Sequence, residues 1–195
     1  MDLFGSDNKI VKIKEDSIFS RGEAKEINRQ IFRDEHCKNT IIEFPKNNEV
    51  AIYISHGLSD AGSFLYAFYE HFGVIDEAYI ATWTISKNNV LKLLEYVDSG
   101  KIKSLVFLLN DGMLKTASTK PIYGLLRNKF DSRNIKYAVA NSHAKVQAYK
   151  CGENMLTISG SGNWSKNPRI EDYVLIGGEK QYNFTKGWIS KIIKK

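Results

Sequence analysis

Cysteine, proline and long apolar runs are scarce in this 195-residue chain. The two cysteines, Cys37 and Cys151, are too few for a disulfide framework or a zinc site of paired cysteines, so we expect reduced, structural thiols. Three prolines and 14 glycines exclude collagen-like and low-complexity classes. No apolar stretch approaches the ~20 residues that span a bilayer, and the first residues are too polar for a secretory signal. We therefore expect a cytoplasmic protein that does not bind membranes.

The composition is that of a chain with a sizeable core. Hydrophobic residues make up 43%, and the chain contains 10 Phe and 10 Tyr. The length fits one domain, since domains usually have ~100–200 residues. We expect a single domain in which residues 1–49 form an N-terminal extension, residues 50–177 the core and residues 178–195 a C-terminal helix.

Positive charge is concentrated in the second half of the chain. The net charge is +6, but residues 1–100 hold 11 Lys and Arg against 16 Asp and Glu, whereas residues 101–195 hold 17 against 6. Concentrated Lys and Arg attract polyanions such as nucleic acid. A basic surface that is merely solvated is the alternative interpretation.

Hydrophobic periodicity predicts alternating strands and helices. Helices are expected over residues 21–35 (after a capping box from Ser20 to Glu23), 64–72, 86–97, 122–130 and 183–195. Strands are expected over 40–44, 50–54, 78–85, 103–109, 135–140, 143–149, 155–159 and 172–176. Strand–helix alternation favours parallel neighbours, and the two runs around residues 150–154 indicate an antiparallel hairpin. The predicted fold is α/β, with a mixed β-sheet flanked by helices.

Two groups of residues in the expected hairpin carry candidate chemistry. His143 and Lys145 are two residues apart, and on a strand this spacing places an imidazole and an ammonium on the same face. The following Ser159-Gly-Ser-Gly-Asn163 allows close backbone approach, and Ser161 and Asn163 offer neutral donors to a phosphate oxygen. Glu171 can accept the second ring N–H of a histidine and fix its tautomer.

In their order these residues resemble the phospholipase D superfamily, whose pattern is H-x-K-x4-D-x6-G-S-x-N with a later glutamate. His143, Lys145, Gly160-Ser161, Asn163 and Glu171 match it. The interval between Lys145 and Gly160 is three residues longer than in the pattern, and Lys150 occupies the aspartate position. The resemblance covers most of the chain and implies a phospholipase D-like fold.

The resemblance also implies a reaction. In that family one histidine attacks phosphorus to give a phosphohistidine, while a second histidine protonates the leaving oxygen and later activates water; no metal or other cofactor is needed. His143, Lys145, Ser161, Asn163 and Glu171 are the implied catalytic residues. The full pattern occurs once, so the resemblance implies a homodimer that brings together one His143 from each subunit. His36, His56 and His71 are expected to lie outside the site.

Four residues are candidates for substrate binding. Trp164 follows the glycine-rich turn and is positioned to stack on a base, although a core position is equally compatible with the pattern. Lys166 and Arg169 follow it closely, and Lys150 is expected to add positive charge near the site. Trp83, inside an apolar run, is expected in the core.

These features favour a metal-independent nuclease with DNA rather than RNA as substrate. A phospholipase D-like protein that binds nucleic acid with weak or no catalysis is the alternative, since the motif aspartate is missing. A lipid phosphodiesterase would use the same chemistry, but the sequence offers no apolar interfacial segment for it.

Overall fold

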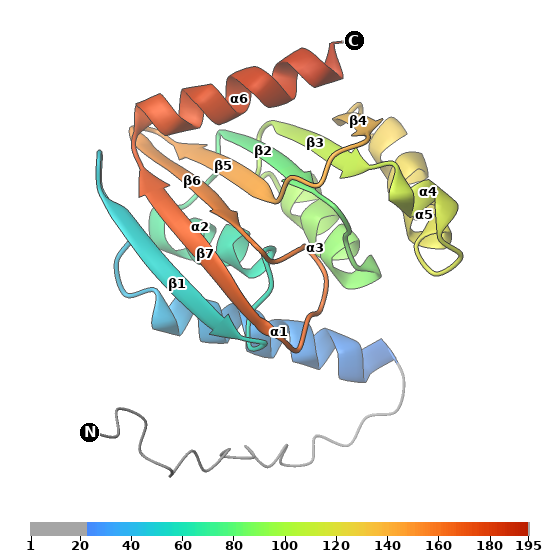
Figure 1. The fold of residues 1–195 in the computed structure, drawn as a ribbon, viewed down its shortest axis with the longest axis horizontal. Coiled ribbons are helices and arrows are strands. Elements are labelled where there is room, and N and C mark those ends of the chain that lie inside the picture. Colours follow the sequence, from blue (N-terminus) through green and yellow to red (C-terminus); the bar gives the residue numbers. More distant parts are fainter. Residues whose placement is uncertain (1–22, 195) are drawn as a thin grey trace, which may run out of the picture.

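The computed structural model describes residues 23–194, which form a seven-stranded mixed β-sheet with helices on both faces (Figure 1). The helices are α1 (Glu23–Thr40), α2 (Ser63–Phe72), α3 (Lys87–Asp98), α4 (Gly112–Lys115), α5 (Lys120–Asp131) and α6 (Glu179–Ile193). The strands are β1 (Val50–His56), β2 (Glu77–Thr82), β3 (Leu105–Asn110), β4 (Lys136–Ala140), β5 (Val146–Cys151), β6 (Asn154–Gly160) and β7 (Ile170–Gly177). The expected fold class is confirmed.

The sheet combines parallel and antiparallel pairs in the order β1-β7-β6-β5-β2-β3-β4. Strands β2, β3 and β4 are parallel neighbours, as the strand–helix alternation predicts. The pairs β5–β6 and β6–β7 are antiparallel, and β5 also lies antiparallel to β2. This pairing places the ends of β2, β3 and β6 and the starts of β5 and β7 at the same edge of the sheet.

Helices cover the two faces of the sheet unequally. Helix α6 crosses one face over β2 to β6, while α2, α3 and α5 pack on the other and α1 packs against α2 (Figure 1). Strand β3 is buried along its whole length because helices lie on both sides of it. Strands β1 and β7 form one edge of the sheet, and the main contacts of α6 are with the other five strands.

The expected strand over residues 40–44 is absent. Thr40 ends α1, where its hydroxyl donates to the carbonyl oxygen of His36 at 2.8 Å, and residues 41–49 form a loop. Ile42 is 87% exposed, whereas Phe44 is buried against Phe68. The run does not pair with the free edge of β1. Phe44 packs inward instead, and the loop is held to the end of β7, where the Asn48 backbone N–H donates to the carbonyl oxygen of Gly177 at 3.0 Å.

Three further expectations about side-chain placement are wrong. Strand β2 ends at Thr82, so Trp83 lies outside the strand and is 41% exposed instead of buried in the core. His143 and Lys145 lie in the loop before β5, not within a strand. The helical periodicity of residues 183–195 also predicts Phe184 on the packed face of the last helix, but Phe184 is 66% exposed.

The sequence also predicts that Ser86 caps a helix and that a helix stops at Gly73, and the structure confirms both. Ser86 caps α3 by accepting from the Asn89 backbone N–H at 3.2 Å, and Gly73, at φ 89°, ends α2. The capping box that starts at Ser20 lies outside the described residues. Within residues 23–194 no helix has both the length and the hydrophobicity needed to cross a bilayer.

Candidate active site

The matched motif residues gather at one end of the sheet. The antiparallel register pairs Ala81 at the end of β2 with Val146 at the start of β5, and Val146 with Ser159 near the end of β6. The Gly160 backbone N–H donates to the carbonyl oxygen of Lys145 at 3.2 Å. The loop that holds His143 and the glycine-rich turn after β6 are therefore joined directly by main-chain bonds.

His143 and Lys145 form a close polar pair. The Lys145 Nζ lies 3.1 Å from the His143 Nδ1 and 3.2 Å from the His143 carbonyl oxygen. An ammonium has only donors, so the Nδ1 accepts this bond and the neutral ring carries its proton on Nε2. His143 is exposed, and Lys145 is half-buried. Burial lowers the pKa of the Lys145 ammonium, and the charge of Glu171 opposes this shift.

Glu171 anchors the glycine-rich turn. Its carboxylate is buried and accepts hydrogen bonds from the Ser161 hydroxyl and the Asn167 side-chain amide. Ser161 Oγ also accepts from the Asp172 backbone N–H at 3.1 Å. The expected bond between Glu171 and the ring of His143 is not formed among the described residues, since Lys145 occupies the Nδ1 side. Glu171 and Ser161 thus position the turn.

Glycines are required where the turn meets β7. A Cβ on Gly160 would overlap with the carbonyl oxygen of Asp172, and one on Gly162 would overlap with the hydroxyl of Tyr173. The Tyr173 hydroxyl and the Asn163 Oδ1 are buried and find no hydrogen-bond partner within the described part of the chain. Unpaired buried polar atoms typically cost ~1–3 kcal/mol each, so this turn holds polar atoms at the expense of stability.

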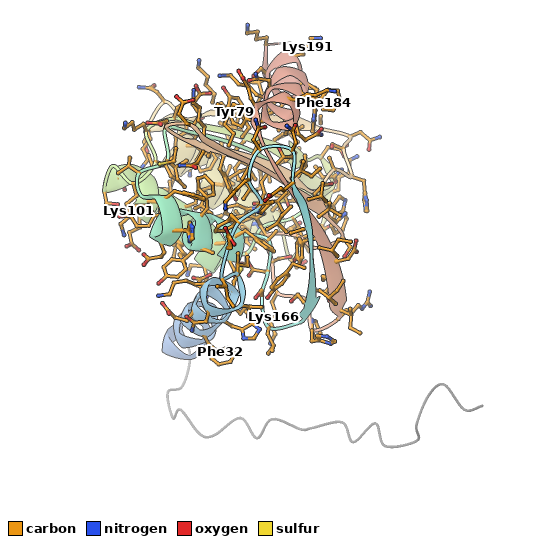
Figure 2. The ribbon with its side chains drawn as sticks, turned by 90° about the vertical axis from the view of Figure 1, so that its left-hand side faces the viewer. Phe32, Tyr79, Lys101, Lys166, Phe184 and Lys191 are labelled. Atoms are coloured by element: carbon orange, nitrogen blue, oxygen red, sulfur yellow. The ribbon has the colours of Figure 1, made fainter. Side chains whose placement is uncertain are left out.

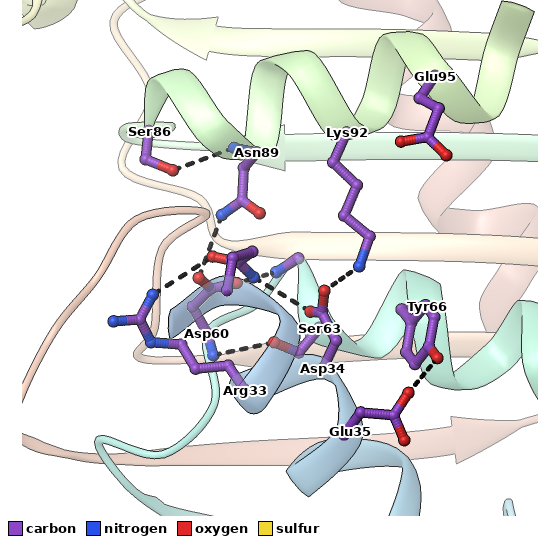
Figure 3. Close-up of polar contacts among 12 residues, drawn as sticks. Arg33, Asp34, Glu35, Asp60, Ser63, Tyr66, Ser86, Asn89, Lys92 and Glu95 are labelled. Carbon is purple, nitrogen blue, oxygen red and sulfur yellow. Dashed lines mark hydrogen bonds and ion pairs between the residues drawn. The ribbon is translucent and has the colours of Figure 1, made fainter. Parts of the chain in front are cut away.

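A buried polar network, of which Figure 3 shows the contact between Asp60 and Asn89, supports the glycine-rich turn. The Asn89 side-chain amide donates to the carbonyl oxygen of Trp164 at 2.8 Å and to the Asp60 carboxylate at 3.1 Å. The Ala61 backbone N–H donates to the carbonyl oxygen of Asn163 at 3.1 Å. Asp60 is buried, and burial raises the pKa of its carboxyl group. Asn89 and the Ala61 backbone thus hold the main chain at Asn163 and Trp164 in place.

Two of the expected substrate-binding residues are not placed for that role. Trp164 is only 3% exposed, and its indole N–H donates to the Gln147 Oε1 at 2.9 Å, so the core alternative is correct and stacking on a base is not. In the strand register Lys150 lies opposite Glu77 and Met155, at the other end of β5. Five residues of extended chain at ~3.3 Å each separate it from Lys145, a distance of roughly 16 Å. The expected place of Lys150 near the site is wrong.

The other two basic residues remain candidates. Lys166 and Arg169 are exposed on the loop that joins the glycine-rich turn to β7. This loop lies beside the segment after β2, because Ile85 and Trp164 form an isolated bridge. Both cations therefore remain available to a polyanion near the site.

His36 and Lys38 have the same H-x-K spacing as His143 and Lys145 but a different setting. They lie on α1, where residues two apart do not share a face, and Lys38 pairs with Glu35 at 3.0 Å. The spacing alone therefore does not specify the site. The neighbouring G-S-x-N turn distinguishes the pair that includes His143.

Sequence reasoning missed two residues at this end of the sheet. The ring of Trp83 lies 6.0 Å from that of His143, centroid to centroid, at an angle of 49°. The Asn110 side-chain amide donates to the Ser142 carbonyl oxygen at 2.7 Å and holds the loop before His143. The polar Thr82 and Thr84 beside Trp83 were the available signal that the buried strand had ended.

Replacing Asn89 with alanine tests the support of the turn. We expect Asn89→Ala to lower the free energy of unfolding by about 2–4 kcal/mol, because the Asp60 carboxylate and the Trp164 carbonyl lose a buried donor. Asn128→Ala, in the exposed part of α5, should change it by less than about 0.5 kcal/mol. Urea unfolding measures both. Equal losses in the two variants would contradict the role given to Asn89.

Comparisons with known proteins bear on the fold. No family model and no curated protein matches the sequence. Among solved structures, the polyphosphate kinase from Porphyromonas gingivalis matches 75% of this chain with a TM-score of 0.56 and 10% identity. The phosphatidylserine synthase of Haemophilus influenzae matches 75% with a TM-score of 0.46 and 10% identity, and the archaeal chromatin protein TrmBL2, described as binding DNA, matches 86% with 0.43 and 11%.

The likeness is one of fold. The matched region spans 26% of the polyphosphate kinase, 38% of the synthase and 62% of the chromatin protein. The match to the polyphosphate kinase confirms the expected architecture, a mixed β-sheet flanked by helices.

Proposed function

We propose that this protein is a metal-independent phosphodiesterase that cleaves nucleic acid, DNA in preference to RNA, through a phosphohistidine intermediate at a homodimer interface. One observation carries the proposal: the exposed His143 lies 3.1 Å from the Lys145 ammonium, at the same sheet end as Asn163 and Glu171. A nucleophile and a cation at this spacing suit a phosphodiester, whose negative charge must be neutralised before attack.

Substrate binding prepares the imidazole for attack. In the unliganded pair Lys145 donates to Nδ1, so the neutral ring keeps its proton on Nε2 and has no lone pair there. A non-bridging phosphate oxygen is a stronger acceptor for the ammonium than the neutral ring. When Lys145 turns to this oxygen, Nδ1 takes a proton from solvent and Nε2 gives its proton to solvent, so the neutral ring then carries its proton on Nδ1. The Nε2 lone pair then faces the phosphorus.

The reaction proceeds in two displacements. His143 Nε2 forms a bond to phosphorus as the bond to the leaving oxygen breaks, and the partner's His143 gives its proton to that oxygen. The same partner histidine then takes a proton from water, which attacks phosphorus and breaks the P–N bond. Lys145 and the Asn163 amide bind the non-bridging oxygens in both steps, and His143 is regenerated.

Exchanging His143 for alanine tests the reaction. In excess EDTA and low salt, we expect the purified protein to cut plasmid and single-stranded DNA, and His143→Ala to lose at least about 1,000-fold in rate while it still shifts DNA on a gel. His71→Ala, at the exposed end of α2, is the matched control and should cut normally. If neither the parent nor the variant cuts but both bind, the protein is a nucleic-acid-binding member of this fold and the enzyme proposal is wrong.

An exposed apolar face on β1 and β7 supports the proposed homodimer. On the α6 side of the sheet, β1 and β7 present aliphatic side chains outside the main contacts of α6; we call them the β1–β7 face: Val50, Ile52, Ile54, Ile170, Val174 and Ile176. Val174 and Ile176 are half-buried, and the exposed Asp172 lies in this face opposite Ile54. Ile52 is 72% and Ile170 67% exposed. Monomeric proteins rarely expose contiguous apolar patches above a few hundred Å².

The position of this face favours a second copy of the chain as its occupant. The register pairs His56 with Ile170 and Ser55 with Glu171, so the face runs directly to the sheet end that holds the candidate site. A site with one His143 per chain needs a twofold-related neighbour there. An isologous contact through the face would bury the same residues on both subunits.

A lysine on this face tests the dimer. We expect Ile52→Lys to turn a dimeric protein into a monomer and to reduce DNA cleavage at least tenfold, because two copies would bury unpaired charges against each other. Leu91→Lys, at a 44% exposed position on α3, adds the same charge and should stay dimeric and active. Light scattering after gel filtration gives the mass. A parent protein that cuts DNA as a monomer would rule out the shared site.

A further inference from the structure

Trp83 is a large aromatic residue exposed at the sheet end where His143 lies. It is 41% exposed, whereas Trp164 is buried and Trp188, on α6, packs against the sheet. Its ring centre is 6.0 Å from that of His143. No other ring contact of the described residues includes His143. A planar ligand that covers an exposed indole removes a large apolar area from water, and this favours binding.

The backbone that carries Trp83 is fixed on both sides. The buried Thr82 hydroxyl donates to the Thr84 carbonyl oxygen at 3.0 Å and accepts from the Trp164 backbone N–H at 3.4 Å. The Ser86 backbone N–H donates to the carbonyl oxygen of Trp164 at 2.8 Å. Trp83 is therefore held on a rigid turn beside the glycine-rich turn.

Small and polar groups border the indole. Gly112, at the start of α4, lies beside it: a Cβ on this glycine would be 3.9 Å from the Trp83 Nε1. On the other side, the parallel Ile85–Trp164 bridge aligns Trp83 with Gly162 of the glycine-rich turn. The cation nearest to the Trp83–His143 ring pair is Lys145, whose Nζ lies 3.1 Å from the His143 Nδ1. An exposed aromatic ring beside a phosphate-binding cation is the arrangement that sequence-tolerant binders of single strands use.

We propose that Trp83 stacks on an unpaired nucleobase next to the phosphate bound at His143 and Lys145, so that the substrate is single-stranded nucleic acid. This inference rests on the proposed function and adds the strandedness of the substrate. A base within a duplex is stacked on both faces and cannot cover the indole without unpairing. A lipid headgroup offers the phosphate but no planar ring.

Binding to three probes tests the platform without cleavage. The background is His143→Asn, which cannot attack phosphorus and keeps a planar polar side chain beside the indole. The probes are a twelve-nucleotide oligothymidylate, an abasic strand with the same number of phosphates and a blunt duplex of the same length. Tryptophan fluorescence and anisotropy are recorded for Trp83→Leu, Trp83→Phe and the control Trp188→Phe in this background.

We expect oligothymidylate to quench the fluorescence of the background protein and of Trp188→Phe, and the abasic strand to leave it unchanged. Trp83→Leu should bind oligothymidylate roughly ten- to a hundredfold more weakly, with unchanged affinity for the abasic strand. Trp83→Phe should retain most of the affinity, because a phenyl ring still stacks.

Failure of this inference can be separated from failure of the proposed function. Equal affinity of Trp83→Leu and the background for oligothymidylate, while the parent protein still cuts DNA through His143, would overturn the stacking role alone. Tighter binding of the duplex than of the single strand would overturn it as well. A parent protein that quenches with oligothymidylate but cuts nothing would support the platform and overturn the nuclease.

Discussion

The site depends on one constraint, the antiparallel pairing of β5 with β2 and β6. This register sets the end of β2, the start of β5 and the end of β6 at the same edge of the sheet. The Lys145 carbonyl and the Gly160 N–H bond across it, so the loop with His143 and the glycine-rich turn cannot separate without breaking the sheet. The two segments are thereby held together by main-chain bonds between neighbouring strands (Figure 1). These strands lie between α6, which carries Phe184 and Lys191, and α1, which carries Phe32 (Figure 2).

Much of this arrangement is predictable because it follows from local patterns. The alternation of apolar runs and turns predicts the mixed sheet, and the hairpin between residues 143 and 159 predicts that the two motif halves meet. The position of Lys150 was not predictable from its place in the motif, because five residues along an extended strand carry it to the opposite end. Trp83 lies outside the core where it was expected, and Trp164 takes the core position that was one of its two alternatives, because local hydrophobicity does not indicate where a strand stops.

The supporting residues depend on tertiary contacts that a single sequence does not reveal. Asp60 and Asn89 lie in segments with no catalytic pattern, yet they hold the main chain of the glycine-rich turn. Glu171 was expected to orient His143, and its carboxylate instead anchors Ser161 and Asn167. In this structure the group next to the His143 Nδ1 is an ammonium. We propose that release of that ammonium to a phosphate couples substrate binding to nucleophilic attack.

The central claim is that His143 becomes covalently bound to phosphorus. Brief reaction with a DNA oligonucleotide, followed by alkaline denaturation and tryptic digestion, would preserve an acid-labile phosphoramidate for mass spectrometry. The account predicts a nucleotide adduct on the peptide of residues 137–145, at His143, and no adduct in His143→Ala. Cleavage without any adduct, or an adduct on another residue, would contradict it.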